Sequence, residues 1–278
     1  MWHLHLEAPA PTRLGVLLPR RDLAAGWMLM VLIAALAWVL TVGQARHMGM
    51  EPGTMGLALP LFLLLWVVMM AAMMLPSVAP VALTWVRGIS RRPAGPAVRA
   101  LHVAEFVSGY LLAWTCFGLL AYGALAVTGR LVEGSADAGR WIGAGAFLLA
   151  GLYQFGPLKG VCLRHCRNPM FQLVRYSRFR PWAKDLRVGA HHGLYCVGCC
   201  WGLMVVLIPL GLMNVAAMAG VAAVIFLEKL WRRGPWLTWV VGIALLVMAA
   251  LAPFQDWLLP GLENAPPMEE MSRMTGLL

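Results

Sequence analysis

Long apolar runs, separated by short polar segments, dominate this chain. A helix rises about 1.5 Å per residue, so about 20 apolar residues cross the hydrocarbon core of a bilayer. Polar positions inside the runs are too few to form the solvated face of a helix in a soluble bundle. The runs of about this length or longer are Leu23–Val42, Gly56–Val86, His102–Val127, Trp141–Leu158, Leu194–Leu227 and Trp236–Trp257. This pattern predicts an all-α fold, a polytopic transmembrane helical bundle.

Basic residues predict how the runs cross the membrane, because lysine and arginine are enriched in loops that stay in the cytoplasm. They gather before the first run, after the second, after the fourth and after the long run 194–227 (Arg13, Arg20, Arg21; Arg87, Arg91, Arg92, Arg99; Lys159, Arg164, Arg167, Arg175, Arg178, Arg180, Lys184, Arg187; Lys229, Arg232, Arg233). The loops on both sides of the long run are cytoplasmic only if that run crosses twice, turning near Gly211–Asn214. We therefore expect about seven spans and a cytoplasmic N-terminus. Six spans, with the long run as one helix, remain open.

Composition supports the same class. Only 12% of the residues are charged and 61% are hydrophobic, with a mean hydropathy of +0.74, whereas about 25% of the residues of a soluble domain are charged. We therefore expect an integral membrane protein that contacts the lipid bilayer. One transmembrane domain is expected over 23–257, between a cytoplasmic N-terminal segment, 1–22, and an acidic C-terminal tail, 258–278.

The net charge of +10 does not indicate a nucleic-acid partner, because the charge lies in the loops and no nucleic-acid-binding motif accompanies it. Phosphate-binding glycine loops, the HExxH metalloprotease motif and an ordered Ser/His/Asp set are also missing from the sequence. The sequence therefore predicts no nucleic-acid binding and gives no indication of an enzyme of these classes.

Five of the six cysteines flank the predicted cytoplasmic loop 159–193. They form two groups with the spacing i, i+3, i+4, which places three side chains on one face of a helix. Cytosolic thiols stay reduced, so such groups indicate metal binding or redox chemistry rather than disulfides. Nearby cations would favour the thiolate form (Lys159, Arg164, Arg167, His191, His192). We expect both groups to converge on one soft-metal site, unless the cysteines are simply small buried residues; the groups are Cys162, His165, Cys166 and Cys196, Cys199, Cys200.

A methionine stripe in the second run is another candidate site. Met69, Met70, Met73 and Met74 lie one turn apart in pairs, just before Pro76 and Pro80. The prolines free backbone carbonyls, which inside a membrane must face protein or a wet cavity. Thioethers are soft ligands that select Cu(I), although methionine also fills irregular gaps in a core. A weaker candidate is the segment RHMGME at 46–51, with His47, Met48 and Met50, which is predicted to lie on the outer side.

Five motifs occur in an order that resembles a known group of proteins. MMAAMMLPS, GLYQFGPLKGVCLRHC, GCCWGLM, GLMN and FLEKL lie between Trp66 and Leu230. Together they are similar to an uncharacterised bacterial family of predicted metal-binding integral membrane proteins. The resemblance implies a multi-pass protein of the bacterial inner membrane with a core of about 66–230. It points to the residues Met69, Met70, Met73, Met74, Lys159, Cys162, Cys166, Cys196, Cys199 and Cys200; Cys116 and RHMGME lie outside the pattern.

The ligand types decide between functions. Thioethers with thiolates favour Cu(I), with Zn²⁺ as the alternative. We therefore expect transport or delivery of Cu(I), with a soluble metallochaperone or a membrane metalloprotein as partner. One alternative is a membrane thiol-redox protein that exchanges electrons with a quinone, which leaves the methionines unexplained. The other is a non-catalytic assembly factor for a membrane metalloprotein, which the sequence does not separate from copper delivery.

Overall fold

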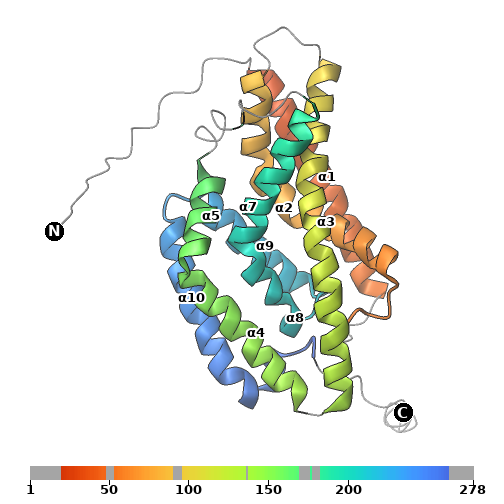
Figure 1. The fold of residues 1–278 in the computed structure, drawn as a ribbon, viewed down its shortest axis with the longest axis vertical. Coiled ribbons are helices and arrows are strands. Elements are labelled where there is room, and N and C mark those ends of the chain that lie inside the picture. Colours follow the sequence, from red (N-terminus) through yellow and green to blue (C-terminus); the bar gives the residue numbers. More distant parts are fainter. Residues whose placement is uncertain are drawn as a thin grey trace, which may run out of the picture.

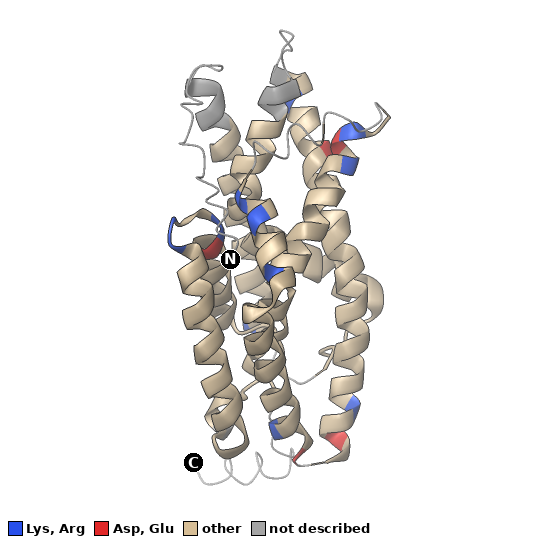
Figure 2. Cartoon of the chain, turned by 60° about the vertical axis from the view of Figure 1, so that its left-hand side comes forward, with Lys and Arg blue, Asp and Glu red and all other residues tan. Residues whose placement is uncertain are grey.

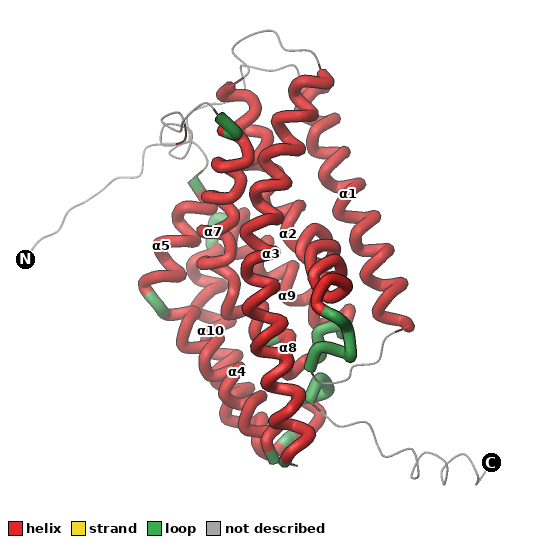
Figure 3. The backbone as a smooth tube through the Cα atoms, turned by 45° about the vertical axis from the view of Figure 1, so that its right-hand side comes forward, coloured by secondary structure: helices red, strands yellow, loops and turns green. Residues whose placement is uncertain are grey.

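A computed structural model describes residues 20–47, 53–89, 96–135, 137–168, 176 and 182–262. Within these residues all regular structure is helical, so the predicted all-α class is confirmed (Figure 3). The segment before residue 20, the candidates Met48 and Met50, and the chain beyond residue 262 lie outside the described residues. The helices are α1 (Arg20–His47), α2 (Leu59–Ile89), α3 (Pro96–Gly134), α4 (Ala138–Phe155), α5 (Pro157–Arg167), α7 (Lys184–Val205), α8 (Leu207–Leu210), α9 (Val215–Leu230) and α10 (Gly234–Leu251), then the 3₁₀ helices η1 (Ala252–Phe254) and η2 (Asp256–Leu258).

Four of the described helices are long and apolar enough to cross a membrane. The candidate spans are Gly26–His47, Leu59–Trp85, Ala97–Gly134 and Gly234–Phe254. The bent pair α4 and α5 makes a fifth if it counts as one span. Helix α7 begins with charged residues and α9 has only 16 residues, so the seven crossings remain a prediction.

The helices are arranged around a central segment formed by α7, α8 and α9 (Figure 1). On one side of it lie α4, α5 and α10, and on the other lie α1, α2 and α3. The helix pairs with the most extensive contacts are α3 with α7, α4 with α10, and α1 with α2. The segment that the sequence assigns to the long apolar run therefore forms the middle of the bundle.

The described surface is more apolar than that of a soluble protein. Large apolar side chains face outward, for example Leu120 at 71% exposed and Trp239 at 61%. Charged residues are scarce along the lower half of the bundle as drawn in Figure 2. The interior nevertheless holds charged side chains that are at most 8% exposed (Lys159, Asp185, Glu228, Lys229). Intramembrane charges are costly and mark functional sites by default.

The predicted span Trp141–Leu158 is not one straight helix. Its axis bends by 65° between α4 and α5. Pro157 cannot continue a helix that precedes it, and Gly156 before it adopts an extended conformation with φ −66° and ψ 140°. Beyond the break α5 packs against α7, and Cys162 and Cys166 lie on its buried face.

The long run Leu194–Leu227 reverses where the sequence predicts a turn. Helix α8 ends at Leu210 and α9 begins at Val215. Gly211 has φ +91°, a backbone conformation that glycine adopts without strain. Asn214 caps α9, because its side-chain oxygen accepts from the backbone N–H of Ala217 at 3.1 Å.

Glycines allow α3 and α7 to approach closely. A Cβ atom at Gly189 would lie 2.0 Å from the carbonyl oxygen of Phe106, and one at Gly109 would lie 2.0 Å from that of Leu186. Small residues at such contacts let membrane helices pack backbone to backbone. This contact fixes the position of α7, and with it the cysteines that α7 carries.

Candidate metal centre

Two helices bring five thiols into the core. Cys162 and Cys166 lie on the buried face of α5, and the other three lie on the buried face of α7. All five are free thiols with at most 7% exposure (Cys162, Cys166, Cys196, Cys199, Cys200), whereas Cys116 is exposed. The two predicted groups thus meet inside the bundle.

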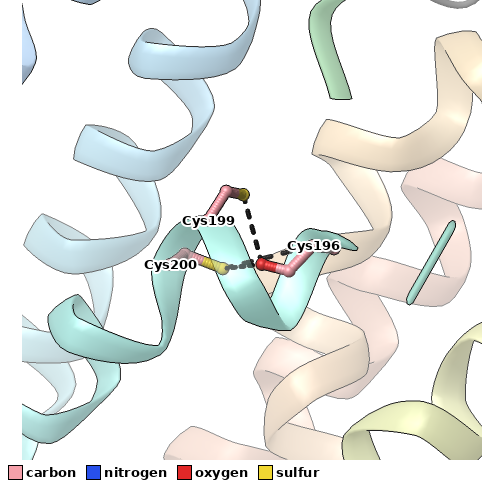
Figure 4. Close-up of side chains that lie close together, drawn as sticks. All are labelled: Cys196, Cys199 and Cys200. Atoms are coloured by element: carbon pink, nitrogen blue, oxygen red, sulfur yellow. Dashed lines mark hydrogen bonds between the residues drawn. The ribbon is translucent and has the colours of Figure 1, made fainter. Parts of the chain in front are cut away.

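Four of these thiols form a compact cluster. The sulfurs of Cys196, Cys199 and Cys200 all lie within 4.8 Å of one another. Cys166 joins them from α5, with its Sγ 3.8 Å from Sγ of Cys199. Figure 4 shows the three α7 cysteines on about one turn of helix, where the thiols of Cys199 and Cys200 donate to the carbonyl of Cys196 at 3.1 and 2.8 Å. We call Cys166, Cys196, Cys199 and Cys200 the thiol cluster.

The dimensions of the thiol cluster fit a thiolate-bound metal ion. With metal–sulfur bonds of about 2.3 Å, two sulfurs lie about 3.8 Å apart in tetrahedral and about 4.0 Å apart in trigonal geometry. The observed separations are 3.8 Å for Cys166–Cys199 and 4.0 Å for Cys196–Cys200. Cys166 is not among the three sulfurs that all lie within 4.8 Å of one another, and it joins them through its contact with Cys199.

Cys162 lies beside the thiol cluster. A Cβ atom at Gly198 would lie 2.8 Å from Sγ of Cys162, so glycine at this position leaves room for the thiol against α7. The hydroxyl of Tyr153 donates to the carbonyl of Gly198 and holds this turn of α7 against α4. Cys162 takes part in neither the Cys166–Cys199 nor the Cys196–Cys200 hydrogen bond.

A lysine that the sequence reasoning missed supplies positive charge to the thiol cluster. The ammonium of Lys229 on α9 donates to Sγ of Cys196 at 2.9 Å and to the hydroxyl of Ser77 at 3.2 Å. The hydroxyl of Tyr110 lies 2.9 Å from the same sulfur. A thiolate at Cys196 would therefore have a cation and a hydroxyl as partners, which favours the form that binds metal. In the sequence, the feature that could have indicated this role of Lys229 is the motif FLEKL, which contains it.

The cations expected from the loop have other roles. Lys159 forms a buried ion pair with Glu228, at 2.8 Å between Nζ and Oε2. The guanidinium of Arg167 donates to the carbonyl of Glu228 and, at 2.8 Å, to that of Trp231. Helix α5 thus holds the C-terminal end of α9, and that end carries Lys229.

The methionine stripe is buried, and its helical spacing places it on the same face of α2 as Ser77, which contacts Lys229. Met69, Met70, Met73 and Met74 are each at most 2% exposed. On a helical wheel at 100° per residue, the four side chains span about 140° of the circumference of α2. We call this the methionine arc, and Ser77 lies near its middle. Because Ser77 accepts from Lys229, which contacts Cys196, this arc is directed toward the side of α2 where the thiol cluster lies.

His165 does not face the thiol cluster in this structure. Its ring stacks on Tyr195 with centroids 3.6 Å apart, and its Nε2 lies 3.0 Å from the hydroxyl of Tyr176. His191 and His192, expected as sources of positive charge, lie near it on α7. The i, i+3 spacing placed His165 correctly on the buried face but did not reveal its partners.

A second group with metal-ligand spacing lies nearer the start of α7. Ligand atoms of His102, Glu105 and Asp185 are within 4.8 Å of one another. Asp185 accepts from Trp85 at 2.7 Å and lies 2.6 Å from Nδ1 of His102. These bonds join α2, α3 and α7, which is a structural role for the group.

Comparison with known proteins assigns the family. A family model described as "PpoB2: Copper chaperone" matches residues 63–252. No curated protein and no solved structure matches the chain. The matched region contains the methionine arc, all of the thiol cluster and Lys229, and it covers more than half of the chain. The chain therefore belongs to the PpoB2 copper chaperone family.

Proposed function

We propose that this protein binds Cu(I) at the thiol cluster and delivers it to another protein. The observation that carries the proposal is the convergence of four buried thiols from α5 and α7 at distances that suit a metal ion. Thiolates select soft ions, so Cu(I) is favoured and Zn²⁺ is the competing ion. Membership of a copper chaperone family supports the same choice.

The methionine arc supports passage of the ion within the membrane. Met69, Met70, Met73 and Met74 supply soft, uncharged thioethers along α2, on the side that faces Lys229. We infer seven spans, with the N-terminus and the thiol cluster toward the cytoplasm of a bacterial inner membrane. The partner would be a soluble metallochaperone on one side or a membrane metalloprotein that receives the ion.

The experiment is elemental analysis of protein purified anaerobically in detergent. Wild type should carry about one copper per chain, and the variant Cys196→Ser, Cys199→Ser, Cys200→Ser should carry none. The matched control is Cys116→Ser, which changes an exposed cysteine far from the thiol cluster in sequence and should keep its copper. Equal copper in the triple variant and wild type would disprove the thiol site, and zinc in place of copper would overturn the choice of metal.

Thiol redox chemistry is the second candidate. One observation favours it: Sγ of Cys166 and Sγ of Cys199, on different helices, are only 3.8 Å apart. A disulfide between them would release a bound ion. If the protein binds no metal and its thiols are reoxidised by a quinone, this candidate replaces the first.

A further inference from the structure

One imidazole and two carboxylates lie together where α7 begins, apart from the thiol cluster. His102 and Glu105 are one turn apart on α3, and Asp185 is in the first turn of α7. One nitrogen or oxygen from each residue lies within 4.8 Å of the other two. Cys196 follows about three turns later on α7, about 16 Å along the helix axis. The group therefore shares no residue with the thiol cluster and lies well away from it.

The three ligand atoms converge on one position. Atoms at separations of at most 4.8 Å have a common point no more than about 2.8 Å from each, which compares with metal bonds of about 2.0–2.2 Å to imidazole nitrogen and carboxylate oxygen. Two of the side chains already touch, since Nδ1 of His102 lies 2.6 Å from Oδ2 of Asp185. A metal ion would take the place of the hydrogen between these atoms, and the imidazole hydrogen would then lie on Nε2.

Hydrogen bonds account for only one of the two carboxylates. Asp185 accepts from Trp85 at 2.7 Å through Oδ1 and contacts His102 through Oδ2. Glu105 is half-buried and has no hydrogen bond or ion pair among the described residues. Its carboxylate is a second negative charge within 4.8 Å of the first. Two like charges held this close favour a cation that contacts both.

The surroundings of the group orient its ligands and leave it accessible. The indole N–H of Trp85 fixes the plane of the Asp185 carboxylate, as hydrogen bonds from outer residues do for metal-bound carboxylates. The ammonium of Lys184, next to Asp185 in the chain, lies over the ring of Trp85 at 5.7 Å from its centroid. The side chain of His102 is 29% exposed, against 7% for Asp185. An ion can therefore reach the carboxylates from the surface beside His102.

We propose that His102, Glu105 and Asp185 form a second metal site, which binds a divalent cation through one nitrogen and two carboxylate oxygens. This ligand set is harder than the thiols, so it suits ions such as Mn²⁺ or Zn²⁺ rather than Cu(I). A bound ion would join α3 to α7 at the start of α7. The inference does not depend on copper binding, because the two sites have no ligand in common.

The test is a titration of the full-length protein in detergent with Mn²⁺, after treatment with a chelator, with free Mn²⁺ followed by electron paramagnetic resonance. Mn²⁺ prefers oxygen ligands to thiolates, so the thiol cluster should not compete for it. Wild type should bind about one Mn²⁺ per chain, and Glu105→Gln should weaken this binding at least tenfold. The matched control is Glu133→Gln, which changes an exposed carboxylate near the other end of α3 and should bind as wild type does.

The copper content of the same variants separates this site from the thiol cluster. Glu105 has no described partner to lose, so Glu105→Gln should fold and carry as much copper as wild type. If wild type binds no Mn²⁺, or if Glu105→Gln binds it as tightly as wild type, the second site is wrong and the thiol site is unaffected. If wild type binds Mn²⁺ but no copper, only the proposed function fails. Should Glu105→Gln not fold, His102→Gln removes the nitrogen ligand and is titrated in its place, with the same two outcomes.

Discussion

The ammonium of Lys229 contacts groups from two other helices. It donates to Ser77 on α2 and to Cys196 on α7, while Lys229 itself lies on α9. A buried charge is stable only with partners, and removing one partner of a buried pair leaves the other uncompensated. Lys229 therefore links the methionine arc to the thiol cluster and offers a positive charge to a metal–thiolate centre.

Replacing this ammonium should weaken metal binding without removing a ligand. Lys229→Met keeps the length of the side chain but takes away the charge that faces Cys196. Groups that support metal ligands are typically worth about 10–100-fold in affinity, so we expect a loss of that size in Cu(I) affinity. Chelator competition measures it, with the exposed Arg232→Gln as control. Unchanged affinity in Lys229→Met would show that the lysine does not stabilise the bound ion.

The two cysteines of α5 should differ in importance. Cys166 contacts Cys199 at 3.8 Å, whereas Cys162 lies against Gly198. We expect Cys166→Ser to lower Cu(I) affinity at least tenfold and Cys162→Ser to change it by less than about threefold, since only the first removes a sulfur of the thiol cluster. Equal losses in both variants, measured by the same competition, would place Cys162 among the ligands.

At the scale of elements, the contact between α3 and α7 positions the site. Gly109 and Gly189 each lie where a methyl group would meet a backbone carbonyl of the opposite helix. Backbone cannot move aside as the end of a flexible side chain can, so close packing leaves little room for relaxation. The bend at Gly156 has the complementary effect, since it directs α5 toward the cysteines of α7.

Gly189→Ala should force α3 and α7 apart. The added Cβ would lie 2.0 Å from the carbonyl oxygen of Phe106, and overpacking of this kind typically costs about 1–3 kcal/mol. We expect a lower unfolding midpoint in detergent and weaker copper binding. Gly145→Ala on α4 is the matched control, because nothing lies within 4 Å of its added methyl group. A midpoint for Gly189→Ala equal to that of the control would contradict the tight contact.

At the scale of the whole molecule, the described part has an apolar exterior, and its mostly apolar interior encloses a few polar and charged groups. Exposed leucine and tryptophan side chains cover α1, α3 and α10, while ion pairs, thiols and imidazoles lie inside. This arrangement suits a protein that holds a charged ion away from lipid. The turn between α8 and α9 returns the chain to the side from which α7 starts, so we expect seven spans rather than six.

Reporter fusions distinguish seven spans from six. With seven spans and a cytoplasmic N-terminus, a fluorescent reporter fused after Arg233 should be active inside the cell, and alkaline phosphatase fused to the end of the chain should be active outside. Six spans reverse both results. A fusion after Asn168 is the control, because that position is cytoplasmic in both arrangements.

Sequence alone gave the class and the broad arrangement. Apolar runs predict helices because a chain in lipid must satisfy its own backbone hydrogen bonds. The i, i+3, i+4 spacing predicted which cysteines share a face, and all five lie buried on α5 and α7. The turn near Gly211–Asn214 followed from loop charge and was found where expected. These features are local in the chain, or depend only on composition.

Contacts between distant residues required the tertiary structure. Lys229 meets Cys196 across 33 positions of the chain and Ser77 across 152, and no periodicity within one helix encodes such pairs. The same holds for Lys159 with Glu228, and for His165, whose ring turns to Tyr195 rather than to the thiols. Sequence thus determined which candidate ligands the chain carries. Helix packing decided which of them meet, because the 65° bend and the glycine contacts set the distances between helices.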